Sequence, residues 1–210
     1  MNKVSIKFLV DSKFFLLNPQ VILDDHVLGI KFFVDGTISS STAWISMDKV
    51  NLFLDPKEVD EVIQIIQKNY VYLERIYLAF HCIGSQAFRF VMYSVLPKII
   101  QVPNIILRIE HCTLMGKSEF NEIISLIQAN KLNYRVYLVL NPESHEFTID
   151  YLYRYKDFVG IGYGSDCPIF DLNLKQSIYN YIDGNLCKET KQKVIEYVFE
   201  CNHRLFRKSD

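Results

Sequence analysis

The amino-acid sequence predicts an α/β fold in which parallel strands and helices alternate in about five to six irregular repeats, with a cap at each end. Three observations predict it. A short phrase recurs along the chain, apolar stripes of helical period fill the intervals, and helix-capping residues stand where the two meet. Regular alternation of strand and helix implies parallel strands that are joined by helical crossovers.

The recurring phrase consists of an apolar residue, any residue, a second apolar residue, two further residues and then a small polar or capping residue. Its copies begin at Val50, Ile76, Leu107, Val136 and Ile161, and an outlying copy begins at Ile30. The first five copies start about 25 to 31 residues apart, which is a period typical of repeat architectures. The apolar pair of each copy is predicted to lie in a strand.

Apolar residues between these copies recur at the spacing of one buried helix face. The stripes are Val59, Val62, Ile63 and Ile66; Phe88, Val91, Met92, Val95 and Ile99; Phe120, Ile123, Ile124 and Ile127; and a weaker one of Ile149, Leu152 and Tyr153. Asp55 precedes Pro56, which places an N-cap residue before a proline at the first helical position. Asn141 precedes Pro142 in the same way, so each strand is predicted to run into a capped helix.

The chain is predicted to form a single domain of residues 1–210. Residues 1–27 are expected to be an N-terminal cap, residues 28–169 the β-α repeats, and residues 170–210 a helical C-terminal cap. Such caps are needed because the open end of a repeat array would expose its core.

The phrases resemble the leucine-rich repeat, whose unit reads L-x-x-L-x-L-x-x-N/C-x-L over about 20 to 29 residues. The Asn or Cys position of that motif is occupied by Asp55, His81, Cys112, Asn141 and Asp166. The unit length is similar to the longer, ribonuclease-inhibitor-like class, and the irregular spacing indicates an irregular array. The resemblance implies a solenoid with strands in sequence order, the helices of the repeats on one face and an open strand face on the other.

A compact α/β domain is the alternative, because any such domain repeats an apolar strand, a capped turn and a helix. A doubly wound sheet has helices on both faces, so its strands are apolar throughout. The strand at Leu107 alternates apolar and charged residues, whereas those at Ile76 and Val136 are mixed. A permuted strand order, or helices of the repeats on both faces, would favour the compact domain.

Composition restricts the location and the partners. The net charge of −1 provides no global attraction to nucleic acid or to an anionic membrane. No stretch reaches the roughly 18 uncharged apolar residues of a membrane span. Five cysteines without a C-x-x-C pair indicate a reducing compartment. We therefore expect a cytoplasmic protein with a protein partner, and neither nucleic acid nor membrane.

The sequence predicts no metal and no cofactor. The pairs His81-Cys82 and His111-Cys112 are one residue out of phase in the repeat register, and the short spacings of known zinc sites are absent. The glycines of residues 160–164 lack the spacing of a phosphate-binding loop and are expected to permit close backbone approach instead. Trp44 is expected to be core or a loop anchor.

The strand face is the predicted binding surface. In the repeat register, side chains beside the apolar pairs project from it, and the central row contains Asn51, Tyr77, Arg108 and Tyr137, with Arg75, Arg135 and Glu110 alongside. Tyrosine and arginine are the residues that interfaces favour at their energetic centres. The competing interpretation is that the two tyrosines are packed beneath a second helical layer.

Two functions follow from these patterns. The first is a non-enzymatic protein-protein interaction module that binds its partner through the strand face. Such modules occur in adaptors and in effectors that bacteria deliver into host cells, where the compartment would be the host cytosol. The second is a small α/β hydrolase-type enzyme whose site lies at the strand C-terminal ends, near Asp55, His81, His111, Asn141 and Asp166.

Overall fold

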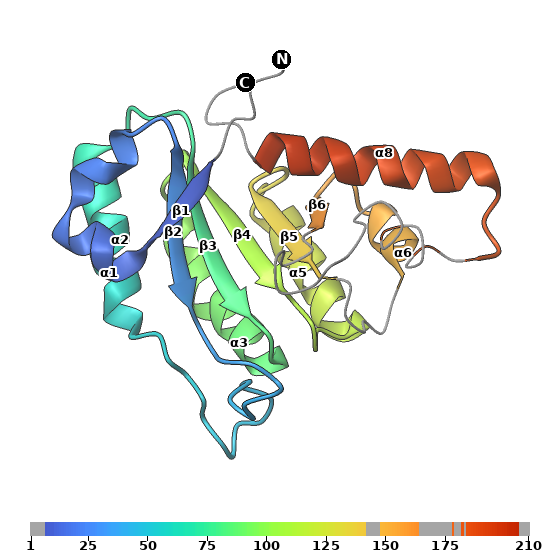
Figure 1. Ribbon diagram of the computed structural model, residues 1–210, viewed down its shortest axis with the longest axis horizontal. Coiled ribbons are helices and arrows are strands. Elements are labelled where there is room, and N and C mark those ends of the chain that lie inside the picture. The colour runs from blue at the N-terminus through green and yellow to red at the C-terminus, as the bar shows by residue number, and fades with distance from the viewer. Residues whose placement is uncertain (1–6, 142–147, 164–177, 179–181, 183, 206–210) are drawn as a thin grey trace.

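The structure is a computed structural model that describes residues 7–141, 148–163, 178, 182 and 184–205. Its strands are β1 (Phe8–Asp11), β2 (Val27–Phe33), β3 (Ile76–Cys82), β4 (Ile105–His111), β5 (Val136–Leu140) and β6 (Gly160–Tyr163). Its helices are α1 (Ser12–Leu17), the 3-10 turn η1 (Pro19–Leu23), α2 (Pro56–Asn69), α3 (Ser85–Phe90), the π-helical turn η2 (Val91–Val95), α4 (Leu96–Ile100), α5 (Lys117–Ala129), α6 (Ile149–Tyr153) and α8 (Lys188–Leu205). Figure 1 shows their arrangement.

The strands form one sheet in the order β1-β2-β3-β4-β5-β6, and every neighbouring pair is parallel. The prediction of parallel strands in sequence order is therefore confirmed for the described part of the chain. Each crossover carries the chain to the adjacent position, so consecutive units pack side by side.

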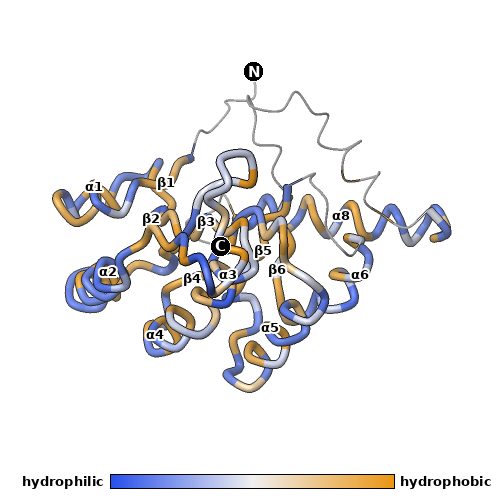
Figure 2. The backbone as a smooth tube through the Cα atoms, turned by 90° about the horizontal axis from the view of Figure 1, so that it is seen from below, coloured by the Kyte–Doolittle hydropathy of each residue, from blue (hydrophilic) through white to orange (hydrophobic). Residues whose placement is uncertain are grey.

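One face of the sheet carries the large core, and α2, α4 and α5 run along it (Figure 2). The two strongest predicted stripes are confirmed: the stripe residues of α2 and α5 are all buried. Asp55 caps α2 as predicted, because its carboxylate accepts a hydrogen bond from the backbone N–H of Lys57 at 2.9 Å. Full burial of one such apolar side chain contributes about 1.5–3 kcal/mol, so these stripes fix the helices on the sheet.

The predicted strand at Val50 is wrong, because residues 50–55 form no strand and lie in the connection between β2 and α2. The outlying copy of the phrase at Ile30 forms β2 instead. β2 and β3 pair directly with each other, so no strand from residues 50–55 lies between them as the repeat order would require. The N-terminal segment also does more than cap the array, since β1 extends the sheet by one parallel strand.

The opposite face is open only in part, which corrects the expectation of a free strand face. Cys201 and Leu205 of α8 pack there against Tyr137 and Val139 in a second, smaller core. Gly162 permits this approach, because a Cβ at that position would lie 2.7 Å from Leu205 Cδ1. The predicted role of these glycines in close packing is thus confirmed at Gly162.

Candidate functional site

The tyrosines of the predicted binding row are part of the second core. Tyr77 is 1% exposed and Tyr137 4%. The hydroxyl of Tyr77 donates to the backbone carbonyl of Arg204 in α8 at 2.9 Å. Burial raises the pKa of Tyr137 to about 12, so the phenol of Tyr137 is neutral at physiological pH. Tyr77 and Tyr137 are thus packed beneath a helix, as the competing interpretation of the sequence expects, and they are not exposed binding residues.

The residues of the predicted row do not all lie opposite one another on neighbouring strands. Arg108 lies opposite Tyr137 as expected, but Tyr77 lies opposite Ile106, and Ala79 faces Arg108. The register between β3 and β4 is shifted by two residues from the repeat register. A shift of two keeps every side chain on its predicted face, because side chains alternate with period two. The prediction of which side chains share a face of the sheet is therefore right, but the predicted alignment of β3 with β4 is wrong.

Asn51 does not belong to the sheet. Its side-chain nitrogen donates to the backbone carbonyl of Ala43 at 3.1 Å, within the connection between β2 and α2. The prediction failed because it placed residues 50–55 in a strand.

Arg135, expected at the margin of the row, holds the end of a helix. Its Nη2 donates to the carbonyls of Ile99 at 2.8 Å and Val102 at 2.6 Å, where α4 turns toward β4. Burial lowers the pKa of this guanidinium, but the carbonyl oxygens solvate its charge. Arg75 precedes β3 and is half-buried. The described contacts give Arg135 a structural role.

Arg108 and Glu110 form an ionic cluster with Lys31 on the second face. Arg108 Nε lies 2.7 Å from one oxygen of Glu110, and the ammonium of Lys31 pairs with the other oxygen. All three side chains are at most 17% exposed. Desolvation lowers the pKa of Arg108 to about 10, which leaves it charged at neutral pH.

The strand C-terminal ends bring two histidines together. The rings of His81 and His111 meet edge to face with centroids 4.4 Å apart, and Asn141 Nδ2 lies 2.8 Å from His111 Nδ1. His111 and Cys112 both have positive φ, at 69° and 52°. Strained backbone of this kind occurs at functional sites, although it also ends strands.

These strand ends supply no activated thiol among the described residues. Cys82 and Cys112 are fully buried, and burial raises the pKa of both thiols, so they are neutral and unreactive. Asp55 caps a helix and takes no part in the group. Asp166 lies outside the described residues. In the described part of the chain, no three His, Cys, Asp or Glu side chains are placed to hold a metal ion.

The connection between β2 and α2, residues 34–55, is a feature that the sequence pattern did not reveal. We call it the β2–α2 loop. It extends beyond the strand ends at the lower edge of Figure 1. Asp35 is 1% exposed and fixes the loop, because its carboxylate accepts backbone hydrogen bonds from Trp44 at 2.9 Å, Ile83 at 3.0 Å and Gly84 at 2.8 Å.

Trp44 completes this anchor. Its side chain is 8% exposed, its indole N–H donates to the carbonyl of Ser46 at 3.1 Å, and its backbone carbonyl accepts from Gln86 at 3.0 Å. Gly84 is required at this junction, because a Cβ there would lie 2.1 Å from the Trp44 carbonyl oxygen. Trp44 is therefore the loop anchor that the sequence suggested.

The anchored loop exposes large apolar side chains to solvent. Five of them are at least half exposed: Ile38, Ile45, Met47, Val50 and Phe53. Phe33, at the end of β2, is exposed to the same degree. The loop also encloses a hollow of about 340 Å³, in which Ile38, Ala43 and Ile45 meet the polar side chains of Lys49 and Asn51. A loop of this length without regular structure is itself a signal that sequence analysis could have used.

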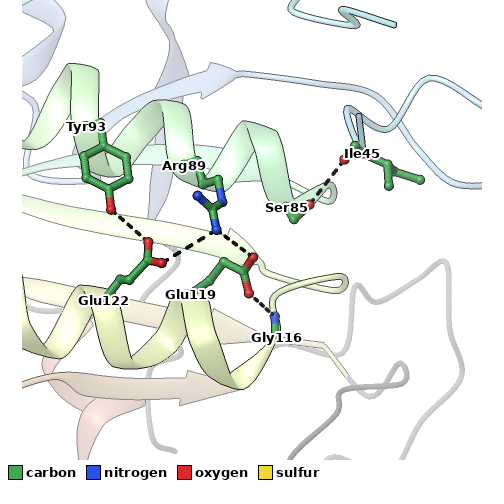
Figure 3. A network of polar contacts seen from close by, with 7 residues as sticks. All are labelled: Ile45, Ser85, Arg89, Tyr93, Gly116, Glu119 and Glu122. Carbon is green, nitrogen blue, oxygen red and sulfur yellow. Dashed lines mark hydrogen bonds and ion pairs between the residues drawn. The ribbon is translucent and has the colours of Figure 1, made fainter. Parts of the chain in front are cut away.

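The helical side of the protein carries a polar network that joins α3 and η2 to α5 (Figure 3). Arg89 Nη2 lies 3.3 Å from Glu119 and 3.6 Å from Glu122, and the Tyr93 hydroxyl donates to Glu122 at 2.8 Å. Its acidic groups are paired with a cation or with a hydroxyl donor, so it serves packing between helices.

No helix among the described residues is long and apolar enough to cross a bilayer.

Comparison of the chain with protein-family models, with curated proteins and with solved structures gives no significant match. The fold defines an α/β protein with an open, sequentially ordered parallel sheet, and its function has to be argued from its own surfaces.

Proposed function

We propose that this protein is a non-enzymatic protein-protein interaction module whose partner binds the β2–α2 loop. One observation carries the proposal: five large apolar side chains are at least half exposed on a loop that is held in place by a buried carboxylate. Contiguous apolar surface on a soluble protein is typical of interaction sites. Loops on a rigid scaffold are also where binding residues concentrate.

The anchor supports this function energetically. Binding through a flexible segment requires its ordering, at about 0.5–1.5 kcal/mol for each immobilised side chain in addition to the backbone. Asp35 and Trp44 order the loop before a partner arrives, so less of the interaction energy is lost on binding.

We further propose that the sheet is an irregular leucine-rich-repeat-like solenoid, with residues 170–210 as its C-terminal cap. The sequential parallel order of the strands supports this architecture. The packing of α8 against β5 and β6 supports a capping role for its segment. In this architecture the loop projects from the strand C-terminal ends, and the charged side chains of Arg108 and Glu110 lie on the adjoining strand face.

The hydrolase-type alternative has one specific observation in its favour. The paired rings of His81 and His111 lie beside positive-φ backbone at the strand C-terminal ends. Against it, the thiols at this place are buried and neutral. We prefer the binding module because its surface is already assembled. For either function we propose a cytoplasmic location, which for an effector is the cytosol of a host cell.

The loop can be tested with a triple variant, Met47→Ser/Val50→Ser/Phe53→Ser. A double variant, Val71→Ser/Tyr72→Ser, is the matched control, because these side chains are equally exposed but follow α2, before β3. We expect both variants to fold. Proteins that bind the wild type and the control should not bind the loop variant. For a purified partner, the affinity of the loop variant should be at least about 100-fold weaker, since interface anchors each contribute about 2 kcal/mol or more. Equal affinity of all three proteins would contradict the proposal.

A further inference from the structure

The two edges of the sheet differ in how their backbone groups are satisfied. At the β6 edge, the side-chain amide of Asn202 in α8 accepts from the N–H of Tyr163 at 2.8 Å and donates to its carbonyl at 3.0 Å. These two hydrogen bonds occupy backbone groups that a further strand would need. Within the part of the chain that the structure describes, no strand or side chain covers the backbone of the β1 edge in this way.

The outward backbone groups of β1 are centred on Leu9. The N–H of Phe8 donates to the carbonyl of His26 at 2.9 Å, so the backbone of Phe8 points toward β2. Successive residues of a strand direct these groups to opposite edges, and the groups of Lys7, Leu9 and Asp11 therefore point outward. An edge strand with unpaired N–H and C=O groups is a template for pairing with another strand.

Large apolar side chains are exposed on the elements at this edge. Figures 1 and 2 both show α1 beside β1 at the same end of the sheet. Four side chains from β1 to η1 are 47% to 81% exposed: Phe8, Phe14, Leu17 and Leu23. Exposed apolar surface of this kind is typical of protein-protein contacts.

The sequence of the β1 edge is complementary to itself. When two copies of β1 pair antiparallel with Leu9 opposite Leu9, Lys7 of each copy lies opposite Asp11 of the other. In the same register, Phe8 lies opposite Val10. Opposite charges, and an aromatic ring beside a β-branched side chain, are both favourable cross-strand pairs. A shift of two residues in either direction removes both charge pairs, so the complementarity selects one register.

Both charged side chains have capacity for this pairing. The ammonium of Lys7 donates to the backbone carbonyl of Asp25 at 2.5 Å and has two further N–H donors. Asp11 is exposed, and its Oδ1 accepts the cap hydrogen bonds from the backbone of Lys13 at 3.0 Å and of Phe14 at 3.3 Å. The Oδ2 atom of Asp11 therefore remains for Lys7 of a second copy.

We propose that a second copy of this chain binds the β1 edge, with the two β1 strands antiparallel about a two-fold axis at Leu9. The two sheets then join into one continuous sheet. Two-fold dimers are the commonest assemblies of a single kind of chain, because the same patch serves both copies. The inference is independent of the proposed function, since the β2–α2 loop follows β2 and is not part of β1.

Sedimentation equilibrium of the full-length chain over a series of concentrations tests the dimer. We expect a monomer–dimer equilibrium for the wild type. Lys7→Glu brings a carboxylate opposite Asp11 twice in each dimer, so its dissociation constant should rise at least about tenfold. Lys13→Glu makes the same change of charge on α1, outside the paired strands, and should leave the dissociation constant nearly unchanged.

A mixture of two variants tests the register. Asp11→Lys brings two ammonium groups together in each charge pair, so this variant alone should dimerise as weakly as Lys7→Glu. An equimolar mixture of Asp11→Lys and Lys7→Glu restores opposite charges in both pairs and should form a mixed dimer with about the wild-type affinity. Circular dichroism establishes that each variant is folded, which matters because Asp11 also caps α1.

The wild type, Lys7→Glu and Lys13→Glu decide the matter even if Asp11→Lys does not fold. A wild type that stays monomeric at every concentration would overturn the proposal. So would equal dissociation constants for Lys7→Glu and the wild type, or a loss of affinity in Lys13→Glu as large as that in Lys7→Glu. A mixture of the two folded variants that associates no more tightly than either variant alone would overturn the register about Leu9.

Discussion

Asp35→Ala is expected to lower the free energy of unfolding by about 3–5 kcal/mol. The substitution removes a buried carboxylate and leaves three backbone N–H groups, those of Trp44, Ile83 and Gly84, without their acceptor. A hydrogen bond to a charged group contributes about 1.5–3 kcal/mol, and a buried donor without a partner adds a desolvation cost. Urea denaturation followed by circular dichroism measures the loss.

The matched control for this prediction lies in the same loop. Asp55 is also an aspartate that accepts backbone hydrogen bonds, but it is exposed and caps α2 through the N–H of Lys57 alone. Asp55→Ala should cost about 1 kcal/mol, the usual value for a lost N-cap. If both variants lose the same amount, Asp35 does not hold the loop in the way described.

Tyr77→Ala is the second substitution with a large expected effect, again about 3–5 kcal/mol, which is typical of a large aromatic side chain removed from a core. Tyr77 is 1% exposed, packs in the second core and bonds to the end of α8. Tyr77→Phe keeps the ring and removes only the hydroxyl, so it should cost about 1 kcal/mol. Urea denaturation measures both losses of unfolding free energy as shifts of the midpoint, provided that the dependence of the free energy on urea concentration is the same for each variant.

The outcome of this pair separates the two interpretations of the tyrosine row. If Tyr77 were a surface anchor, Tyr77→Ala would leave the stability of the protein almost unchanged and would abolish binding of the partner. If Tyr77 is a core residue, Tyr77→Ala destabilises the protein. Retention of full stability by Tyr77→Ala would restore the strand face as the predicted binding surface and contradict the packing described here.

The elements that could be predicted from the sequence are those with local causes. The stripes of α2 and α5 are visible as a spacing of three and four residues, and their burial follows from it. The strand at Phe8–Asp11 was missed because four residues are too few to show a period. Register was missed because a phrase of period two fits equally well after a shift of two residues.

The candidate site lay beyond sequence reasoning for a different reason. Asp35 defines the loop through Ile83 and Gly84, which are 48 and 49 residues away along the chain. No local pattern records such a contact. The apolar residues at 50 to 54 resemble a strand when taken alone, and only the completed sheet shows that they are left outside it. Glu110 and Arg108 were correctly placed on one face, but their pairing with Lys31 required the register.

Amide hydrogen exchange of the protein with and without a partner recovered by the wild type is the most direct measurement of the central claim. The claim predicts that exchange slows on binding within residues 34–55. The outer surfaces of α2 and α5 should exchange at the same rate in both states. Slower exchange confined to the ends of β3, β4 and β5, or to those helices, with residues 34–55 unchanged, would contradict the assignment of the β2–α2 loop as the binding surface.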